Sequence, residues 1–95
     1  MISFTVRMKF AEADHEVVAE MLRKLTLASR QEPGCVNYVS HFLAGDPGTV
    51  LIYEQYVDEA ALEAHQNTAH FREYGSEGFY RLMRAQQIKY MDAIV

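Results

Sequence analysis

Apolar and polar residues alternate over the first ten positions of the chain. Every even position from 2 to 10 is apolar, and the odd positions between them are polar or charged. A period of two is the pattern of a strand with one buried face. We therefore predict a strand over residues 2–10.

Helical spacing replaces this alternation in the next segment. Asp14 is the expected N-cap, and apolar residues then recur three and four positions apart from Val17 to Ala28. Pro33-Gly34 is a pair that stops helices and turns the chain. The pattern predicts a helix that begins at Asp14 and ends before Pro33.

The stretch that follows favours a hairpin. Residues 36–43 and 49–56 are rich in β-branched and aromatic side chains, which are common in strands. Residues 44–48, which lie between them, have the Gly, Asp and Pro composition of a turn. We predict two antiparallel strands joined by this turn.

A second helical segment begins at Asp58, another expected N-cap, and continues through His65. Asn67-Thr68 has the composition of a fresh cap, so we expect the helix to kink or restart there. Two glycines loosen the remainder, which we expect to run to about Arg84.

The order of the predicted elements defines a fold class. With a last, weaker strand at 86–92, the chain is β-α-β-β-α-β in one domain of residues 1–95. This is the order of the ferredoxin-like α+β fold, in which four antiparallel strands carry their helices on one face.

The second strand of the hairpin has apolar side chains on both faces. Val50, Ile52 and Tyr56 share one side, whereas Leu51 and Tyr53 share the other. One layer of helices covers only one face of a sheet, and strands that are apolar on both sides are usually buried on both. A second copy of the sheet is the simplest cover, so we predict a homodimer through the sheet face.

Composition and charge exclude several classes of protein. The net charge is −4 and the Lys and Arg residues are scattered, so we expect no nucleic-acid binding. The only cysteine, Cys35, cannot form an internal disulfide, which argues against a small secreted framework. We see no signal peptide and no apolar run long enough to span a membrane. We therefore expect a cytoplasmic protein with no membrane partner.

Two segments resemble a known family. They are EPGCVNYVSH at 32–41 and YEQYVDEAALEAHQNTAHF at 53–71. With the order of elements, they resemble the antibiotic biosynthesis monooxygenase (ABM) domain over nearly the whole chain. The resemblance implies a dimeric α+β barrel, in which two sheets pack face to face, and a pocket between the sheet and the helices.

The resemblance implies a chemically mixed set of activities. The family includes cofactor-independent oxygenases of anthrones and polyphenols, quinol monooxygenases, haem-degrading enzymes and an isomerase of a phosphorylated autoinducer. Haem-degrading members use an Asn on the first strand and a later axial His, where this chain has Arg7 and Tyr74-Gly75. The chain also lacks a dinucleotide-binding fingerprint. We therefore expect an enzyme that uses no cofactor.

Oxidation of a small quinol or polyphenol by O₂ makes simple demands on a protein. It needs an apolar cavity for a flat ring, a base with a pKa near neutral, and a donor for the developing oxyanion. Histidine suits the role of base, and a buried glutamate has a raised pKa or orients a histidine. The candidate catalytic residues are Glu54, His65, His70 and His41. The candidate substrate contacts are the aromatic residues Tyr38, Phe42, Tyr56, Phe71 and Tyr74.

The two histidines of the second helical segment invite a test for a metal site. His65 and His70 are five positions apart, which is a rotation of about 140° on a straight helix. A kink at Asn67-Thr68 would bring them together, but no second His-rich or Cys-rich cluster completes a site. We therefore expect no metal.

Two other functions fit the same pattern. An isomerase of a small carbonyl or phosphosugar would use the same His and Glu side chains without O₂, and a phosphate would require a cluster of Lys and Arg in the pocket. A non-enzymatic ligand-binding dimer would have a closed sheet–helix space, too small for an aromatic ring.

Overall fold

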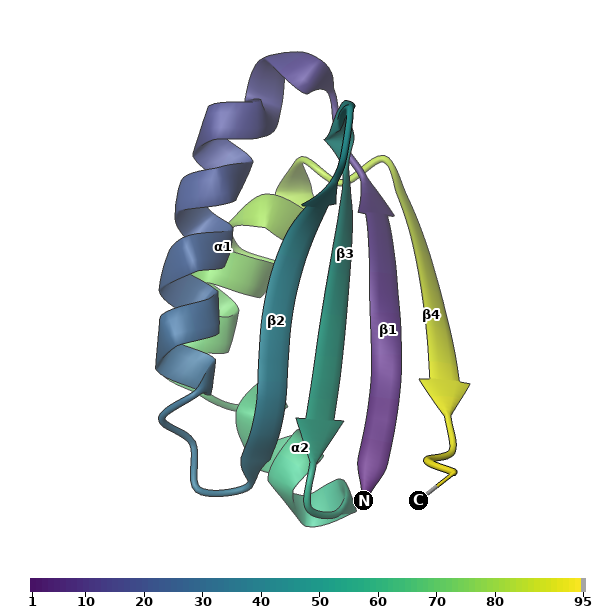
Figure 1. Ribbon diagram of the computed structural model, residues 1–95. Helices are drawn as coiled ribbons and strands as arrows, with labels where there is room; N and C mark the ends of the chain where they lie inside the picture. The colour runs from purple at the N-terminus through teal and green to yellow at the C-terminus, as the bar shows by residue number, and fades with distance from the viewer. Residues whose placement is uncertain (95) are drawn as a thin grey trace.

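The helices lie on one face of a four-stranded antiparallel sheet (Figure 1). The computed structural model describes residues 1–94. The strands have the order β2-β3-β1-β4. Their bounds, and those of the two α-helices, are β1 Ile2–Lys9, α1 His15–Ser29, β2 Cys35–Leu43, β3 Asp46–Tyr56, α2 Glu59–Gln66 and β4 Ala85–Met91. This arrangement confirms the predicted ferredoxin-like α+β fold.

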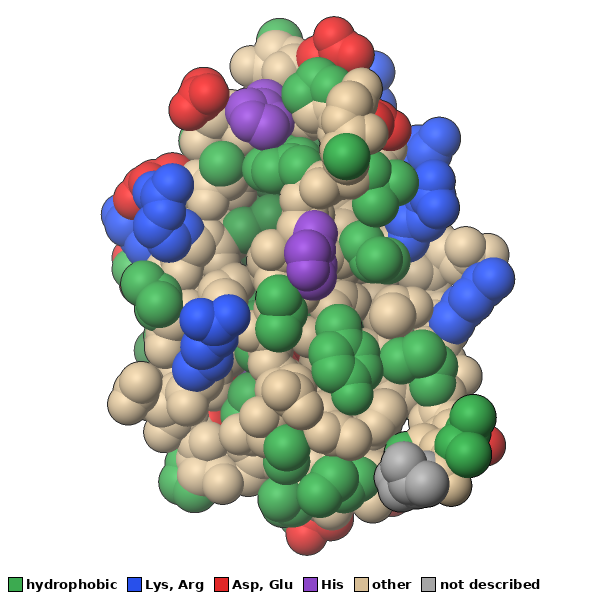
Figure 2. Space-filling view, in the orientation of Figure 1, with side chains coloured by type: hydrophobic (Ala, Val, Ile, Leu, Met, Phe, Trp, Pro, Cys, Tyr) green, Lys and Arg blue, Asp and Glu red, His purple; other side chains and the backbone are tan. Residues whose placement is uncertain are grey.

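Alternation along the strands separates a buried face from an open one. In β3, Val50 and Ile52 are buried against the helices, whereas Leu51 and Tyr53 are half-exposed on the opposite side. The same alternation in β1 buries one parity of its apolar residues in the core. The prediction that β3 is apolar on both faces is therefore confirmed. Figure 2 shows a histidine in the middle of the visible face, with hydrophobic side chains around it.

Two element boundaries differ from the predictions. Asp14 occupies the N-cap position of α1, but its side chain makes no capping hydrogen bond, because the short 3₁₀ turn η1 (Glu12–Asp14) precedes the helix. The hairpin turn is also shorter than predicted, since β3 already begins at Asp46. Gly45 has a φ of 76°, a left-handed conformation that glycine adopts without strain.

The second helical segment breaks where the sequence predicted a restart. Asp58 caps α2 through a 2.8 Å hydrogen bond from the Ala61 N–H to its carboxylate. The helix ends at Gln66, and Thr68 then joins the two parts. Its hydroxyl donates to the His65 carbonyl at 2.7 Å and accepts from the Phe71 N–H at 3.1 Å. The chain therefore bends between the two histidines.

The segment after the bend is not the long helix that we predicted. It contains the π-helical turn η2 (Phe71–Ser76) and the 3₁₀ turn η3 (Phe79–Arg81), and β4 begins soon afterwards. Gly78 separates the two turns, and a Cβ at this position would lie only 2.1 Å from the Tyr74 carbonyl oxygen. Only a residue without a Cβ therefore fits at position 78 in this backbone conformation.

A close approach of two backbones places the turn after α1 against α2. A Cβ on Gly34 would lie 2.3 Å from the Cβ of Ala61. The Gly34 carbonyl also accepts a 2.9 Å hydrogen bond from the Val57 N–H, which holds the turn beside the start of α2. Glycine at position 34 therefore lets the two segments touch.

Gly34→Ala is expected to lower the free energy of unfolding by about 2 kcal/mol, because an added methyl group overpacks this contact. Adding Ala61→Gly should recover part of the loss, although glycine inside a helix itself costs about 1 kcal/mol. Urea unfolding of the single and double variants measures both effects. Gly75→Ala is the control, since its Cβ would meet no atom closer than 3.5 Å. If the two Ala substitutions have equal effects, the close approach does not limit packing.

Within residues 1–94, the structure has no helix that is long and apolar enough to cross a membrane.

Candidate active site

Glu32 is the centre of a group of ionisable side chains beneath the bend. It lies in the turn between α1 and β2. Two hydrogen bonds fix this turn, one from the Glu32 N–H to the Ser29 carbonyl and one from the Cys35 N–H to the Glu32 carbonyl. Its side chain is 13% exposed. The carboxylate therefore lies largely under protein rather than in solvent.

Two imidazoles converge on this carboxylate. His65, in the last turn of α2, places Nδ1 2.9 Å from Glu32 Oε2, and His70 places Nε2 2.6 Å from the same oxygen. The side chain of His65 is 2% exposed and that of His70 is 23% exposed. The two histidines are five positions apart, and the bend at Asn67-Thr68, which the sequence analysis offered as the alternative to a straight helix, turns both toward Glu32.

A second carboxylate lies behind His65. Glu54 is on the helix-facing side of β3, and its Oε1 is 3.8 Å from His65 Nε2. The Tyr56 hydroxyl donates a 2.6 Å hydrogen bond to the same Oε1. The groups thus form a path from His70 through Glu32 and His65 to Glu54, which is hydrogen-bonded at Glu32 and has a separation of 3.8 Å between His65 and Glu54.

Burial shifts the proton affinities along this path. The pKa of Glu54 is raised to about 7, mainly by burial and in smaller part by the charge of Glu32, although the Tyr56 hydrogen bond opposes the shift. Burial lowers the pKa of His65, although the hydrogen bond and negative charge of Glu32 act in the other direction. Glu54 therefore holds a proton more tightly, and His65 less tightly, than the same group does in water.

Aromatic side chains enclose the ring of His65. The ring centroids of Tyr38, Tyr56 and Phe71 lie 5.7, 5.2 and 5.1 Å from that of His65, and Phe71 meets it edge-on. Tyr38 and Tyr56 are both buried. Three of the five predicted aromatic contacts thus surround the histidine directly.

The remaining predicted residues lie elsewhere. His41 is exposed on β2, where its Nδ1 is 3.1 Å from the Leu51 carbonyl oxygen. Phe42 packs on His15, with ring centroids 4.1 Å apart. Tyr74 lies on η2 with the Lys24 ammonium 5.7 Å from its ring centroid. The structure therefore does not bring these residues to the Glu32 cluster.

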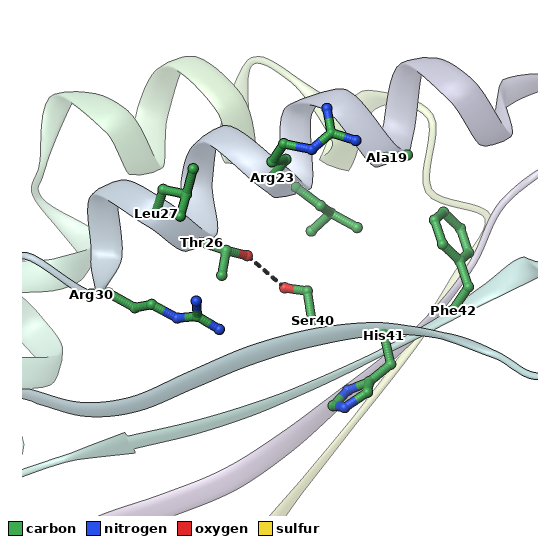
Figure 3. A pocket seen from close by; sticks show the side chains of 9 residues that line it. Ala19, Arg23, Thr26, Leu27, Arg30, Ser40, His41 and Phe42 are labelled. Atoms are coloured by element: carbon green, nitrogen blue, oxygen red, sulfur yellow. Dashed lines mark hydrogen bonds between the residues drawn. The ribbon is translucent and has the colours of Figure 1, made fainter.

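A hollow between α1 and β2 is lined by polar and apolar side chains. Its volume is about 310 Å³, and Figure 3 shows Arg23 and Arg30 along its helix side and the Thr26–Ser40 hydrogen bond of 2.8 Å crossing it. None of Glu32, Glu54, His65 and His70 lines it. The two arginines of this hollow therefore do not lie beside Glu32, Glu54, His65 and His70, where an isomerase of a phosphosugar would need them.

Glu32 is the member of the cluster that the sequence analysis did not select. The residue was visible as the first position of the Glu-Pro-Gly motif at 32–34. Its place next to a helix-stopping pair showed that it lies in a turn, but no pattern indicates which distant histidines meet it. The available signal was a carboxylate beside a turn, followed later in the chain by two histidines five positions apart.

The chain matches the family model described as "Antibiotic biosynthesis monooxygenase" over residues 1–76. Comparison with curated proteins gives no match. Among solved structures, PA3566 from Pseudomonas aeruginosa is 32% identical, with 99% of this chain and 94% of that chain covered and a TM-score of 0.90. A structure described as an antibiotic biosynthesis monooxygenase is 26% identical, with both chains fully covered and a TM-score of 0.90.

These matches include the segments that build the cluster. The family match spans the Glu-Pro-Gly turn, β3 and both histidines of the bend. A protein from Bacteroides thetaiotaomicron, assigned provisionally to the same monooxygenases, superimposes with a TM-score of 0.92 at 25% identity, with 99% of this chain and 90% of that chain covered. The chain therefore belongs to the antibiotic biosynthesis monooxygenase family.

Proposed function

We propose that this protein is a monooxygenase that oxidises a small quinol or polyphenol with O₂ and uses no cofactor. The observation that carries the proposal is the buried path His70–Glu32–His65–Glu54, in which one carboxylate accepts hydrogen bonds from two imidazoles. Such a path can remove a proton from a phenolic hydroxyl and hold it near neutral pH.

His70 is the base that meets the substrate in this proposal. It is the most exposed imidazole of the cluster at 23%, whereas His65 lies behind it at 2%. With its Nε2–H donating to Glu32, the lone pair on Nδ1 is free to accept the hydroxyl proton. Glu32 then stabilises the imidazolium, and His65 and Glu54 provide a second location for the proton.

The substrate itself supplies the electrons for the reaction. Its anion passes one electron to O₂, and the resulting radical and superoxide combine to a hydroperoxide at a ring carbon. Loss of water leaves a carbonyl, so a hydroquinone and O₂ give a hydroxyquinone and H₂O. All four electrons that reduce O₂ come from the ring, and no external reductant is consumed.

Oxygen uptake tests the proposal. The EDTA-treated protein is mixed with menadiol, or with a simple anthrone, in an oxygen electrode, and protein-free autoxidation is subtracted. The proposal expects uptake well above the blank, with one ¹⁸O atom from ¹⁸O₂ in the product. Uptake equal to the blank for both substrates, or a product without ¹⁸O, would contradict it.

We also propose that two copies pair through the open sheet face, and that the protein is cytoplasmic, in keeping with its one free cysteine. Val39, Leu51 and Tyr53 are half-exposed on this face, although no helix covers it. Sedimentation velocity is expected to show a dimer, and Tyr53→Lys a monomer. Val17→Lys, which adds the same charge on the exposed side of α1, should remain dimeric. A monomeric wild type would exclude the interface.

A further inference from the structure

We propose that Glu32, His65 and His70 also form a binding site for a divalent transition-metal ion such as Zn²⁺. One ligand atom from each residue lies within 4.8 Å of the other two. The three residues come from the turn after α1, the end of α2 and the segment just beyond the bend. They therefore converge from separate parts of the chain on one point.

The spacing of the three atoms is close to that of a coordination sphere. The two imidazole nitrogens lie 2.9 and 2.6 Å from Glu32 Oε2. A tetrahedral zinc ion with bonds of about 2.0–2.1 Å separates neighbouring ligands by about 3.3 Å. The two nitrogens lie within 4.8 Å of each other, so side-chain shifts of about 1 Å would admit the ion, and the side chain of His70, which is 23% exposed, is the least enclosed of the three.

The donor set determines which ions fit. Two imidazoles and one carboxylate suit zinc and its transition-metal neighbours, whereas Mg²⁺ and Ca²⁺ prefer an all-oxygen sphere. Two His and one Glu, with a fourth position left open, is also a ligand set found in zinc enzymes. The three residues therefore favour zinc and neighbouring transition-metal ions over Mg²⁺ and Ca²⁺.

Glu54 completes the arrangement as an outer partner. When His65 coordinates through Nδ1, its proton resides on Nε2, which faces Glu54 Oε1 at 3.8 Å. Metal-bound histidines usually donate their second ring N–H to a carboxylate or carbonyl. The Tyr56 hydroxyl in turn holds this carboxylate in place at 2.6 Å. The carboxylate that would serve as the outer partner of a metal-bound His65 therefore already lies beside it, and a small approach would bring it within hydrogen-bond distance.

Binding of the ion would oppose the reaction proposed above. The ion would occupy Glu32 and the nitrogens that face it, so the carboxylate could no longer stabilise an imidazolium at His70. Zn²⁺ is therefore expected to inhibit oxygen uptake. The binding itself is measured without substrate, so its outcome is independent of whether the protein is an oxygenase.

Calorimetric titration of tag-free, EDTA-treated protein with Zn²⁺ tests the site. We expect one ion per chain, and a loss of affinity of more than about 100-fold in His70→Ala, which exceeds the roughly 10- to 100-fold cost of removing an outer partner. Glu54→Gln should fall within that smaller range. His41→Ala is the matched control and should bind like wild type.

Two results would overturn the inference. One is the absence of binding to wild type, and the other is equal affinity in wild type and His70→Ala. Thermal unfolding in EDTA verifies that each variant is folded, which is expected because the His70 side chain is partly exposed. Co²⁺ gives a second readout, since its visible absorption bands should appear with wild type and be lost in His70→Ala.

Discussion

Replacing Glu32 with glutamine is expected to lower the rate of substrate oxidation by about 100- to 1,000-fold while the protein stays folded. The carboxylate accepts hydrogen bonds from both His65 and His70, so it orients both rings and stabilises a positive charge on either. A neutral amide of the same size keeps the packing but loses the charge. Oxygen uptake at saturating quinol measures the effect.

The pH profile separates this role from a purely structural one. Without the negative charge of Glu32, the imidazolium is less stable, so the rate should reach half its plateau at a lower pH than in wild type. Glu32→Asp keeps the charge and should recover part of the rate. Glu63→Gln, an exposed change on α2, serves as the control. An unchanged rate in Glu32→Gln would remove the carboxylate from the mechanism.

Glu54→Gln is expected to be more stable than wild type by about 3 kcal/mol at pH 8, and equally stable below pH 4. The pKa of Glu54 is about 7 in the folded protein, against 4.5 for an ordinary glutamate, and burial is the main cause. The folded state therefore binds more protons than the unfolded state between these values. Wild type loses stability as the pH rises through this window, whereas the variant has no proton to lose.

Other ionisable groups lie near Glu54, so the difference in stability between the two proteins is the quantity to measure. These groups are Glu32, Cys35, Tyr38, Tyr56, His65 and Tyr80. His65 has a lowered pKa and contributes with the opposite sign, since its stabilisation is lost as the pH falls. Urea unfolding in EDTA from pH 4 to 8 gives both curves. A difference that does not change with pH would show that folding leaves the pKa of Glu54 unshifted.

The fold could be predicted from the sequence because its signals are local. Alternation in β1, the Asp58 cap and the fresh start after Asn67 each depend on residues close together in the chain. Predictions failed where contacts that no pattern of residue types reports decide the structure. The second helical segment does not run to Arg84: α2 ends at Gln66, and the turns η2 and η3 follow on either side of Gly78, where a Cβ would lie 2.1 Å from the Tyr74 carbonyl oxygen.

The candidate site could be predicted only in part, for the same reason. His65, His70 and Glu54 stand out as polar residues in otherwise apolar or helical surroundings, and the structure brings these three together. His41 has the same residue type but lies on the exposed face of β2. Glu32 is 33 positions from His65, so its role follows from the packing of the first turn against α2.

The shared oxygen of Glu32 limits how much charge the interior can carry. One carboxylate balances one imidazolium, so a first proton taken up by either ring leaves the trio electrically neutral. A second would leave a net positive charge beside the sealed ring of His65, with little water to solvate it. Glu32, His65 and His70 together therefore take up one proton far more readily than two. On the proposed mechanism, a diol that gives up both hydroxyl protons would therefore pass the first one on, to Glu54 or to solvent, before the second is taken up.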